Sequence, residues 1–222
     1  MDGIQGALIK TDRRRLRGQE TRKHLVRAAI ELFGKHGYEA TSTRSIAQMA
    51  GCNLGLISFH FGSKQNLYDE VRDEVRQEME RGSRRLTQRL RQISSLGMEK
   101  EDLRKAAAEC VEMVVDALSA HAGDDAYFMM VRRSMQAGDE ASRRLFNESF
   151  MPPFREIVRI LDELHEGEHR FNELKAFMAL ESVFCLMRDY PYLAMGVGRE
   201  IDVLKDTGML TEIIRGMLRP EE

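Results

Sequence analysis

Residues 21–67 read TRKHLVRAAIELFGKHGYEATSTRSIAQMAGCNLGLISFHFGSKQNL, and this stretch decides the fold. Apolar residues recur at helical spacing across 25–33, and Gly37 supplies a stop signal. The hydroxyl residues of 41–43 can cap a second, shorter helix that ends at Gly51. A medium helix, a short helix and a glycine-containing turn are the first parts of a helix-turn-helix.

A third helix and a long fourth helix follow this turn. Asn53 can cap a short helix over residues 54–61, which a glycine closes. Ser63 then begins a long connecting helix, expected from about residue 64 to residue 94. One medium helix followed by two short ones predicts a helix-turn-helix head over residues 19–68.

The rest of the chain predicts a second unit made of helices. The sequence contains only four prolines, and proline-poor stretches rich in Arg, Glu, Leu, Ala and Met favour helix over strand. The fold class is therefore all-α, with a three-helix head joined to a larger C-terminal helical domain over residues 69–222. Residues 1–18 lack periodicity and are expected to form a flexible basic arm. The helices expected in the larger domain cover 99–121, 124–136, 139–165 with a break near Pro152 and Pro153, 170–189 and 200–217.

Charge is distributed unevenly along the chain. The formal net charge is −2, yet residues 1–65 contain eleven basic and five acidic side chains, so the remainder is acidic. A basic head on an acidic body presents one face to phosphates and repels them elsewhere. The cluster Arg13-Arg14-Arg15-x-Arg17 can lie along a DNA backbone or enter a minor groove, and it is equally compatible with a solvated tail.

The composition also bears on where the protein works. No run of about 18 apolar residues is present to span a membrane, and no apolar segment follows the early arginines as in a signal peptide. The cysteines Cys52, Cys110 and Cys185 are far apart and odd in number. This pattern is typical of reduced thiols rather than of a disulfide framework. We therefore expect a cytoplasmic protein with no membrane partner.

Four short pieces of the deciding stretch occur in a recognisable order. They are Ala28-Ala29…Leu32-Phe33, Gly37-Tyr38…Ala40-Thr41, Ile46-Ala47…Ala50-Gly51 and Phe59-His60-Phe61-Gly62-Ser63-Lys64. Together they resemble the DNA-binding head of the TetR family of transcription regulators, and the version Asn53-x-x-x-Ile57-x-Phe59 looks closest to the CecR-like branch. The resemblance covers about the first 70 residues. It implies a homodimer that binds DNA through the head and responds to a small molecule through the C-terminal domain.

The chemistry of the third helix agrees with what the resemblance implies. A recognition helix enters a major groove about 12 Å wide, so its leading face needs small or adaptable residues, and apolar side chains there suit thymine methyls. The resemblance places Arg44 where it can reach a base edge, and Thr43, His60 and Lys64 where relatives contact phosphates. The candidate DNA-binding residues are Thr43, Arg44, Asn53, Leu54, Gly55, Leu56, Ser58, Phe59, His60 and Lys64.

Two positions of the third helix depart from the family pattern. Many relatives have threonine where Leu56 stands and tyrosine where Ser58 stands, and both commonly contact the DNA backbone. Their replacement puts the usual phosphate clamp in doubt for this chain.

The C-terminal domain is expected to bind an effector and to form the dimer. Methionine is a flexible gap-filler, so the many methionines of this domain could line an adaptable apolar pocket or could simply form its core. Relatives pair the helices equivalent to 170–189 and 200–217 across a two-fold axis, although these apolar faces could instead close the core of one subunit. The candidate pocket residues are Met113, Leu118, Phe128, Met129 and Phe177.

One further string resembles a catalytic motif. His165-Glu166-Gly167-Glu168-His169 matches the H-E-x-x-H pattern of zinc proteases. That chemistry needs both histidines on one helix face and a third ligand, whereas Gly167 interrupts a polar segment and no clear third ligand follows. We expect no catalytic residue, no metal and no cofactor.

These features predict a sequence-specific DNA-binding regulator. We expect a repressor that a small apolar or amphipathic effector releases from a palindromic double-stranded operator, because repression by promoter occupancy is the simpler mode. One alternative is a DNA-binding regulator without a small-molecule effector, controlled by a partner protein. A more distant alternative is a helical metalloenzyme.

Overall fold

The computed structural model describes residues 2–95, 125–164 and 172–178, together with positions 181, 212 and 216. All regular secondary structure in these ranges is helical, with no strand, so the fold class is all-α as predicted. The chain divides into two compact units: a head unit of Met1–Val75 and Asp125–Gln136, and a body unit of Arg76–Asp124 and Ala137–Glu222. No helix in the described ranges is long and apolar enough to cross a membrane.

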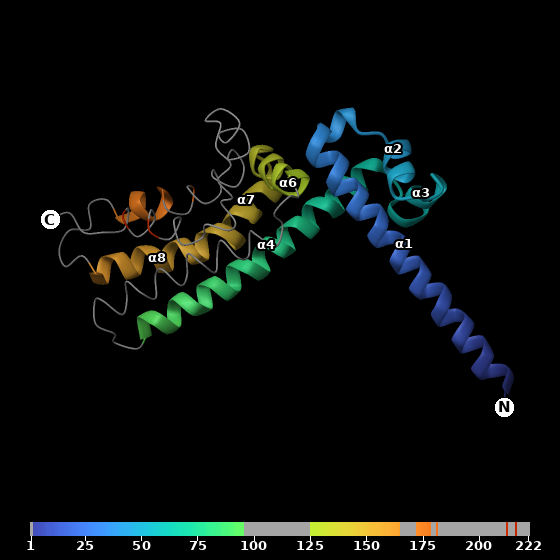
Figure 1. Cartoon of the computed structure of the whole chain (residues 1–222), viewed down its shortest axis with the longest axis horizontal. Coiled ribbons are helices and arrows are strands. Elements are labelled where there is room, and N and C mark those ends of the chain that lie inside the picture. Colours follow the sequence, from blue (N-terminus) through green and yellow to red (C-terminus); the bar gives the residue numbers. More distant parts are fainter. Residues whose placement is uncertain are drawn as a thin grey trace. The chain divides into compact units, whose positions relative to one another are not determined.

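Helix α1 extends over Asp2–Ala40 (Figure 1). Residues 2–18, expected to form a flexible basic arm, are helical and form its first turns. The segment contains no proline, and a helix that is already nucleated propagates through residues that show no hydrophobic period. Helical geometry is interrupted at Gly37, where φ is 81° and ψ is 173°. The predicted stop signal at Gly37 thus marks a kink that side chains other than glycine rarely adopt.

Helices α2 (Thr43–Met49) and α3 (Gly55–Phe61) form the expected pair of short helices. Ser42 caps α2 in a capping box with Ser45: the Ser42 hydroxyl accepts from the Ser45 backbone N–H at 3.0 Å, and the Ser45 hydroxyl accepts from the Ser42 N–H at 3.2 Å. The turn between the helices is closed by the N–H of Cys52, which donates to the Ala47 carbonyl at 2.9 Å. Local hydrogen bonds therefore set the angle between α2 and α3.

Helix α4 covers Lys64–Ser95, close to the predicted range of 64–94. Ser63 caps it, because the Ser63 hydroxyl accepts from the N–H of Asn66 at 3.0 Å. The first turns of α4, as far as Val75, complete the core of the head unit. The buried apolar side chains that α1 to α4 contribute to this core are Leu25, Val26, Ala28, Ala29, Leu32, Phe33, Ile46, Ala47, Ile57, Phe61, Leu67, Val71 and Val75.

Helix α6 (Asp125–Gln136) forms where the sequence predicts a helix, but it belongs to the head unit rather than to the C-terminal domain. It packs on α1 with its Ala126 and Met130 side chains buried. The closest approach is at Gly34 of α1, where a Cβ atom would overlap the Ala126 carbonyl group and lie 2.8 Å from the Ala126 Cα. Arg133 adds a polar contact, since its Nε donates to the Gly34 carbonyl at 3.1 Å.

The described part of the body unit contains α7 (Glu140–Leu145), the π-helical turn η1 (Phe146–Phe150) and α8 (Met151–Leu164). The sequence predicts one helix over 139–165 with a break near its two prolines, and the π turn lies directly before them. Pro152 and Pro153 have no N–H to donate to carbonyls four residues earlier. In η1 the N–H of Met151 donates instead to the carbonyl of Phe146, five residues back.

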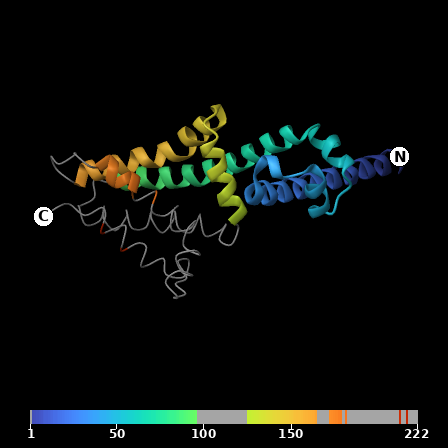
Figure 2. The same cartoon turned by 90° about the horizontal axis from the view of Figure 1, so that it is seen from above.

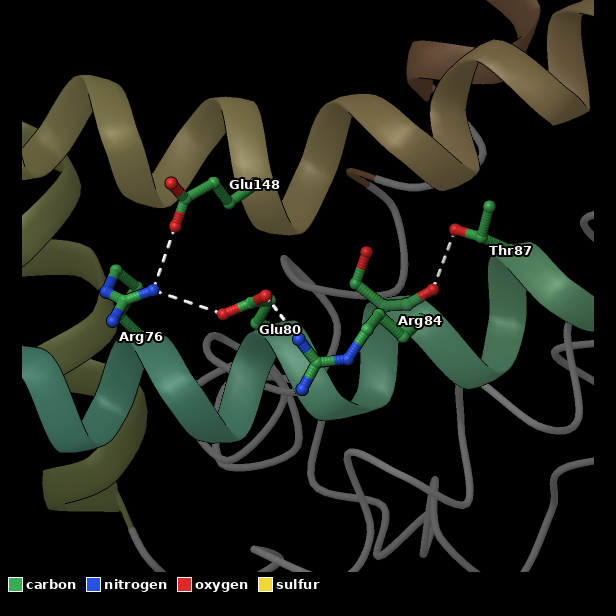
Figure 3. Close-up of polar contacts among 6 residues, drawn as sticks. Arg76, Glu80, Arg84, Thr87 and Glu148 are labelled. Carbon is green, nitrogen blue, oxygen red and sulfur yellow. Dashed lines mark hydrogen bonds and ion pairs between the residues drawn. The ribbon is translucent and has the colours of Figure 1, made fainter.

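Charged side chains join the second half of α4 to η1 and α8, which run beside it (Figures 1 and 2). Arg76 of α4 binds Glu148 of η1 at 2.8 Å and Glu80 at 3.1 Å, and Arg84 pairs with the other oxygen of Glu80 (Figure 3). The Arg76 side chain is only 19% exposed. This partial burial and the two carboxylate partners distinguish the cluster from an ordinary surface ion pair.

A second link joins Arg91 of α4 to Glu156 of α8 at 2.7 Å. Burial of Glu156 acts to raise its pKa, but hydrogen bonds and charges from Arg91 and Arg159 together outweigh burial and lower the pKa below its ordinary value. A lowered pKa in the folded state stabilises the fold at neutral pH. That contribution is lost as the pH falls through the lowered pKa.

Replacement of Gly34 by alanine tests the contact between α1 and α6. We expect Gly34→Ala to destabilise the protein by about 1–3 kcal/mol, because the new methyl group meets the backbone of Ala126. Gly82→Ala in α4 is the matched control, since a Cβ at Gly82 meets no atom within 4 Å; it should be neutral or stabilising by up to about 1 kcal/mol. Thermal unfolding followed by circular dichroism checks both, and an unchanged melting temperature for Gly34→Ala contradicts the contact.

Candidate nucleic-acid interface

Helix α3 has one face in the core of the head unit and one face in solvent. Ile57 is 2% exposed and Phe61 is 8% exposed, so these two side chains, four residues apart, fix the inner face. Phe59 is 78% exposed, the most exposed large apolar side chain among the residues described. Because the inner face is buried, α3 can present its outer face to a ligand in only one orientation.

The outer face carries most of the residues predicted to approach a base edge. Leu54, Gly55 and Ser58 are exposed with Phe59, whereas Leu56 is half-buried. The surface is thus apolar with small residues between, as contact with thymine methyl groups requires. The two positions that depart from the family pattern lie here: Leu56 has no hydroxyl to offer a phosphate, and Ser58 has a short side chain.

Asn53 serves the turn before α3. Its side-chain oxygen accepts from the N–H of Gly55, two residues on, at 2.9 Å. The N-cap residue of α3 is Leu54, which makes no side-chain cap, so Asn53 does not occupy the predicted N-cap position. A Cβ at Gly55 would lie 3.3 Å from that same oxygen. Glycine at this position therefore leaves room for the asparagine side chain as well as for an approaching ligand.

Thr43 and Arg44 are the first two residues of α2, the helix that precedes α3. Thr43 is half-buried and Arg44 is exposed. Among the residues that the structure describes, Arg44 has no ion-pair or hydrogen-bond partner. Its guanidinium is therefore available for a planar, two-point contact of the kind that reads guanine.

His60 and Lys64 mark the end of α3 and the start of α4. The His60 ring is half-buried and lies between the rings of Phe59 and Phe61, with centroid distances of 5.0 and 6.1 Å. The Lys64 ammonium lies 4.2 Å from the centroid of the Tyr38 ring. A cation at the first residue of a 32-residue helix adds to the positive end of the helix dipole.

The basic residues of the head differ in whether a carboxylate already binds them. Arg22 pairs with Glu70 at 2.6 Å and lies over the Phe61 ring at 5.2 Å, so it ties α1 to α4 and its charge is neutralised. Lys35 pairs with Glu31 in the same way. Arg44 and Lys64, in contrast, have no carboxylate partner within the described ranges, which leaves their charges for an external anion.

Two residues that matter to this surface are absent from the sequence-based candidates. The Tyr38 ring lies beneath the Lys64 ammonium, and the Arg22 guanidinium lies over the Phe61 ring. Tyr38 stands in one of the quoted sequence pieces, but its proximity to Lys64 joins positions 26 residues apart and leaves no local pattern. For a basic residue such as Arg22, the sequence alone does not show whether the side chain forms an internal ion pair or contacts a ligand.

Three of the five candidate effector residues lie in the described ranges. Phe128 and Met129 lie half-buried on α6 of the head unit, and Phe177 of the body unit is 50% exposed. Met113, Leu118 and the string His165 to His169 lie outside the described residues. Within the described ranges, no group of three or more histidine, cysteine, aspartate or glutamate residues could hold a metal ion.

Residues 25–71, which contain α2, α3 and the first turns of α4, match the family described as bacterial regulatory proteins, tetR family. Over these residues the chain is similar to the DNA-binding head of the TetR family. This result confirms the resemblance seen in the four sequence pieces. The matched TetR segment contains every candidate DNA-binding residue, from Thr43 to Lys64.

Two curated HTH-type regulators are similar to a short part of the chain. The chain is 45% identical over 53 residues to the HTH-type transcriptional dual regulator CecR of Shigella flexneri, a match covering 24% of this chain and 23% of the relative. It is 42% identical over 53 residues to the HTH-type transcriptional regulator AcrR of Shigella flexneri, covering 24% of this chain and 25% of the relative. The chain thus spans no more than a quarter of the length of either relative.

The fold is similar to that of solved TetR-like regulators. The crystal structure of a TetR-like transcriptional regulator from Rhodococcus sp. RHA1 superposes with a TM-score of 0.57 at 18% sequence identity. The superposition covers 89% of this chain and 93% of the Rhodococcus chain. It shows that the TetR arrangement of helices continues beyond the segment that sequence similarity detects.

The two phenylalanines of α3 provide a test of its two faces. We expect Phe59→Ala to change the free energy of unfolding by less than about 0.5 kcal/mol, because its ring is exposed. Phe61→Ala should cost about 3–5 kcal/mol, because its ring is buried in the head. Chemical denaturation measures both changes. If Phe59→Ala destabilises the chain as much as Phe61→Ala does, the outer face of α3 has been wrongly assigned.

Proposed function

We propose that this protein is a sequence-specific DNA-binding transcriptional regulator that reads the major groove with α3. The observation that carries the proposal is the exposed apolar face of α3, whose opposite face is anchored by Ile57 and Phe61, together with the unpaired charge of Arg44 on α2. An exposed phenylalanine ring on a short, rigidly held helix is unfavourable in water. It is removed from water only when the helix contacts a partner. Within the family, the 45% identity over the head supports the CecR-like branch.

The protein acts as a homodimer on a palindromic operator. The helical segment 172–178 carries Leu174, Phe177 and Met178, each about half exposed, while Asn172 and Ala176 are buried. This apolar side fits the helix pair near 170–189 and 200–217 that we expect to join two subunits. Two-fold symmetry would then place the two α3 helices in successive major grooves about 34–36 Å apart.

The regulator is a repressor whose affinity for DNA falls when the body binds an effector. The pocket is expected to include Met113, Leu118, Phe128, Met129 and Phe177, and its apolar composition favours an apolar or amphipathic molecule. Phe128 and Met129 lie on α6, which packs on α1 through Gly34. An effector that contacts these residues can change DNA affinity only by as much as its own affinity differs between two positions of α6. The competing proposal is that a partner protein, and not a small molecule, controls the regulator. In either case we propose that the protein acts in the cytoplasm.

Selection from a random duplex pool at physiological salt tests the central part of this proposal. The full chain, shown beforehand to be folded and dimeric, is incubated with the pool, and bound sequences are amplified and read. We expect an enriched palindrome, because each base contact separates right from wrong sequences by about 1–3 kcal/mol. No enrichment at any position would contradict sequence-specific binding, since non-specific phosphate contacts favour no sequence.

The selected duplex then distinguishes the roles of Arg44 and Lys64. Arg44→Ala should relax the preference at one operator position and weaken binding by about 1–3 kcal/mol. Lys64→Ala should weaken all sequences alike and reduce the slope of log K against log salt by about one unit. Arg85→Ala, which removes an exposed arginine from the body half of α4, should change neither property. Titrations of labelled duplex at several salt concentrations supply the measurements, and Arg44→Ala with unaltered sequence preference would refute its assignment.

A further inference from the structure

The ammonium of Lys64 is held over an aromatic ring before any ligand arrives. Its Nζ lies 4.2 Å from the centroid of the Tyr38 ring, and the lysine side chain is half-buried. Lys64 is the first residue of α4, whose first turn Ser63 caps through the N–H of Asn66 at 3.0 Å. Both the backbone and the charged end of Lys64 therefore have a defined position in the free head.

The Tyr38 ring is itself fixed by two aromatic neighbours. It stacks on Phe33 with a centroid distance of 6.0 Å and an interplanar angle of 23°, and it meets Tyr68 at 4.9 Å. Phe33 and Tyr68 are in edge contact with each other at 5.0 Å, and Phe33 is fully buried. The three rings form one cluster that joins the end of α1 to the start of α4, so the platform beneath Lys64 cannot rotate away independently.

The backbone that carries Tyr38 is held from both sides. The buried hydroxyl of Thr41 donates to the carbonyl of Gly37 at 2.7 Å, which closes the kink in α1. On the other side, a Cβ at Gly37 would lie 3.1 Å from Nη1 of Arg133 of α6. The kink at Gly37, with φ of 81°, is thus packed against α6 as well as bonded to Thr41.

A ring orients a lysine without neutralising it. An ion pair such as Arg22 with Glu70, at 2.6 Å, uses the charge that a phosphate would need. An aromatic face attracts the cation through its quadrupole and leaves the charge in place. The ammonium has three N–H donors, so those that do not face the ring remain for an anion. Lysine otherwise loses much rotamer freedom when it binds, and a side chain already held in place loses less.

We propose that Tyr38 is a positioning residue for DNA binding: its ring holds the Lys64 ammonium at the start of α4, where it meets a backbone phosphate of the duplex. The inference rests on the proposed function and adds to it a residue that does not touch DNA. Because phosphates occur at every step of the duplex, Tyr38 contributes to affinity equally for all sequences and not to sequence preference.

A double-mutant cycle on the full chain tests this role. The variants are Tyr38→Leu, Tyr38→Phe, Lys64→Ala and the pair Tyr38→Leu/Lys64→Ala, each titrated with selected and scrambled duplexes across a range of salt. We expect Tyr38→Leu to weaken both duplexes by about two- to five-fold, the strength of an exposed cation–π contact. Tyr38→Phe should restore the affinity, since phenylalanine keeps the ring. In the Lys64→Ala background, Tyr38→Leu should have no further effect.

Three results would overturn the inference. Equal losses from Tyr38→Leu with and without Lys64 would mean that Tyr38 does not act through the lysine. Loss of affinity in Tyr38→Phe as large as in Tyr38→Leu would mean that the hydroxyl, not the ring, matters. A wild-type chain that binds no duplex at low salt contradicts the proposed function and this role together, whereas additive losses in a chain that does bind contradict this role alone.

A second measurement covers the case in which Tyr38→Leu fails to fold. In the unliganded wild-type chain, the ε-methylene protons of Lys64 should resonate upfield of the other lysines, because they lie above the face of the Tyr38 ring. Lys64→Ala identifies the signal by its loss. An ε-methylene shift of Lys64 equal to that of the exposed Lys23 would show that the ring does not hold the side chain, and would overturn the inference without any Tyr38 variant.

Discussion

The burial of Ile57 and Phe61 is the constraint on which the reading surface depends. A helix of seven residues has little stability of its own, so α3 exists because its inner face is removed from water in the core of the head. That anchoring fixes the rotation of the helix about its axis. As a consequence, the side chains between and beside the two anchors face solvent. Ser58 and Phe59 are among them, and no contact of their own is needed to expose them. Residues that stabilise α3 and residues proposed to bind DNA are therefore immediate neighbours in the sequence.

The head is larger than the helix-turn-helix, and its extra parts explain how the surface is supported. The aromatic cluster of Phe33, Tyr38 and Tyr68 ties the end of α1 to the start of α4, the two ends of the chain segment that carries α2 and α3. Helix α6 closes on α1 where Gly34 leaves no side chain in the way. In the body unit, α4 is attached by a different chemistry, through the partly buried Arg76 and its carboxylate partners on α4 and η1. Apolar and aromatic packing organises the head, and the described part of the body combines buried apolar side chains with these ion pairs.

The sequence predicts the local features well, because caps, stops and periodicity act over a few residues. It places α2 and α3 within one or two residues of their observed ends, the long helix from Lys64, and an irregularity beside Pro152 and Pro153. It gives no helical period for residues 2–18, which are helical nonetheless, because the absence of a hydrophobic period does not stop a helix that is already formed. It also fails to place α6 on the head or Tyr38 beneath Lys64. Both depend on contacts between distant positions, and the glycine that permits the first looks like any other helical glycine.

Hydroxyl-radical footprinting of the full chain, with and without the selected duplex, tests most directly the claim that the outer face of α3 reads DNA. Oxidation of exposed side chains is measured residue by residue by mass spectrometry, with Phe146 of the body unit, 41% exposed, as the internal reference. The account predicts that Phe59 and Leu54 react readily in the free protein and are protected in the complex, while the reactivity of Phe146 does not change. Phe59 reacting at the same rate in a fully bound complex would show that DNA is held by another surface.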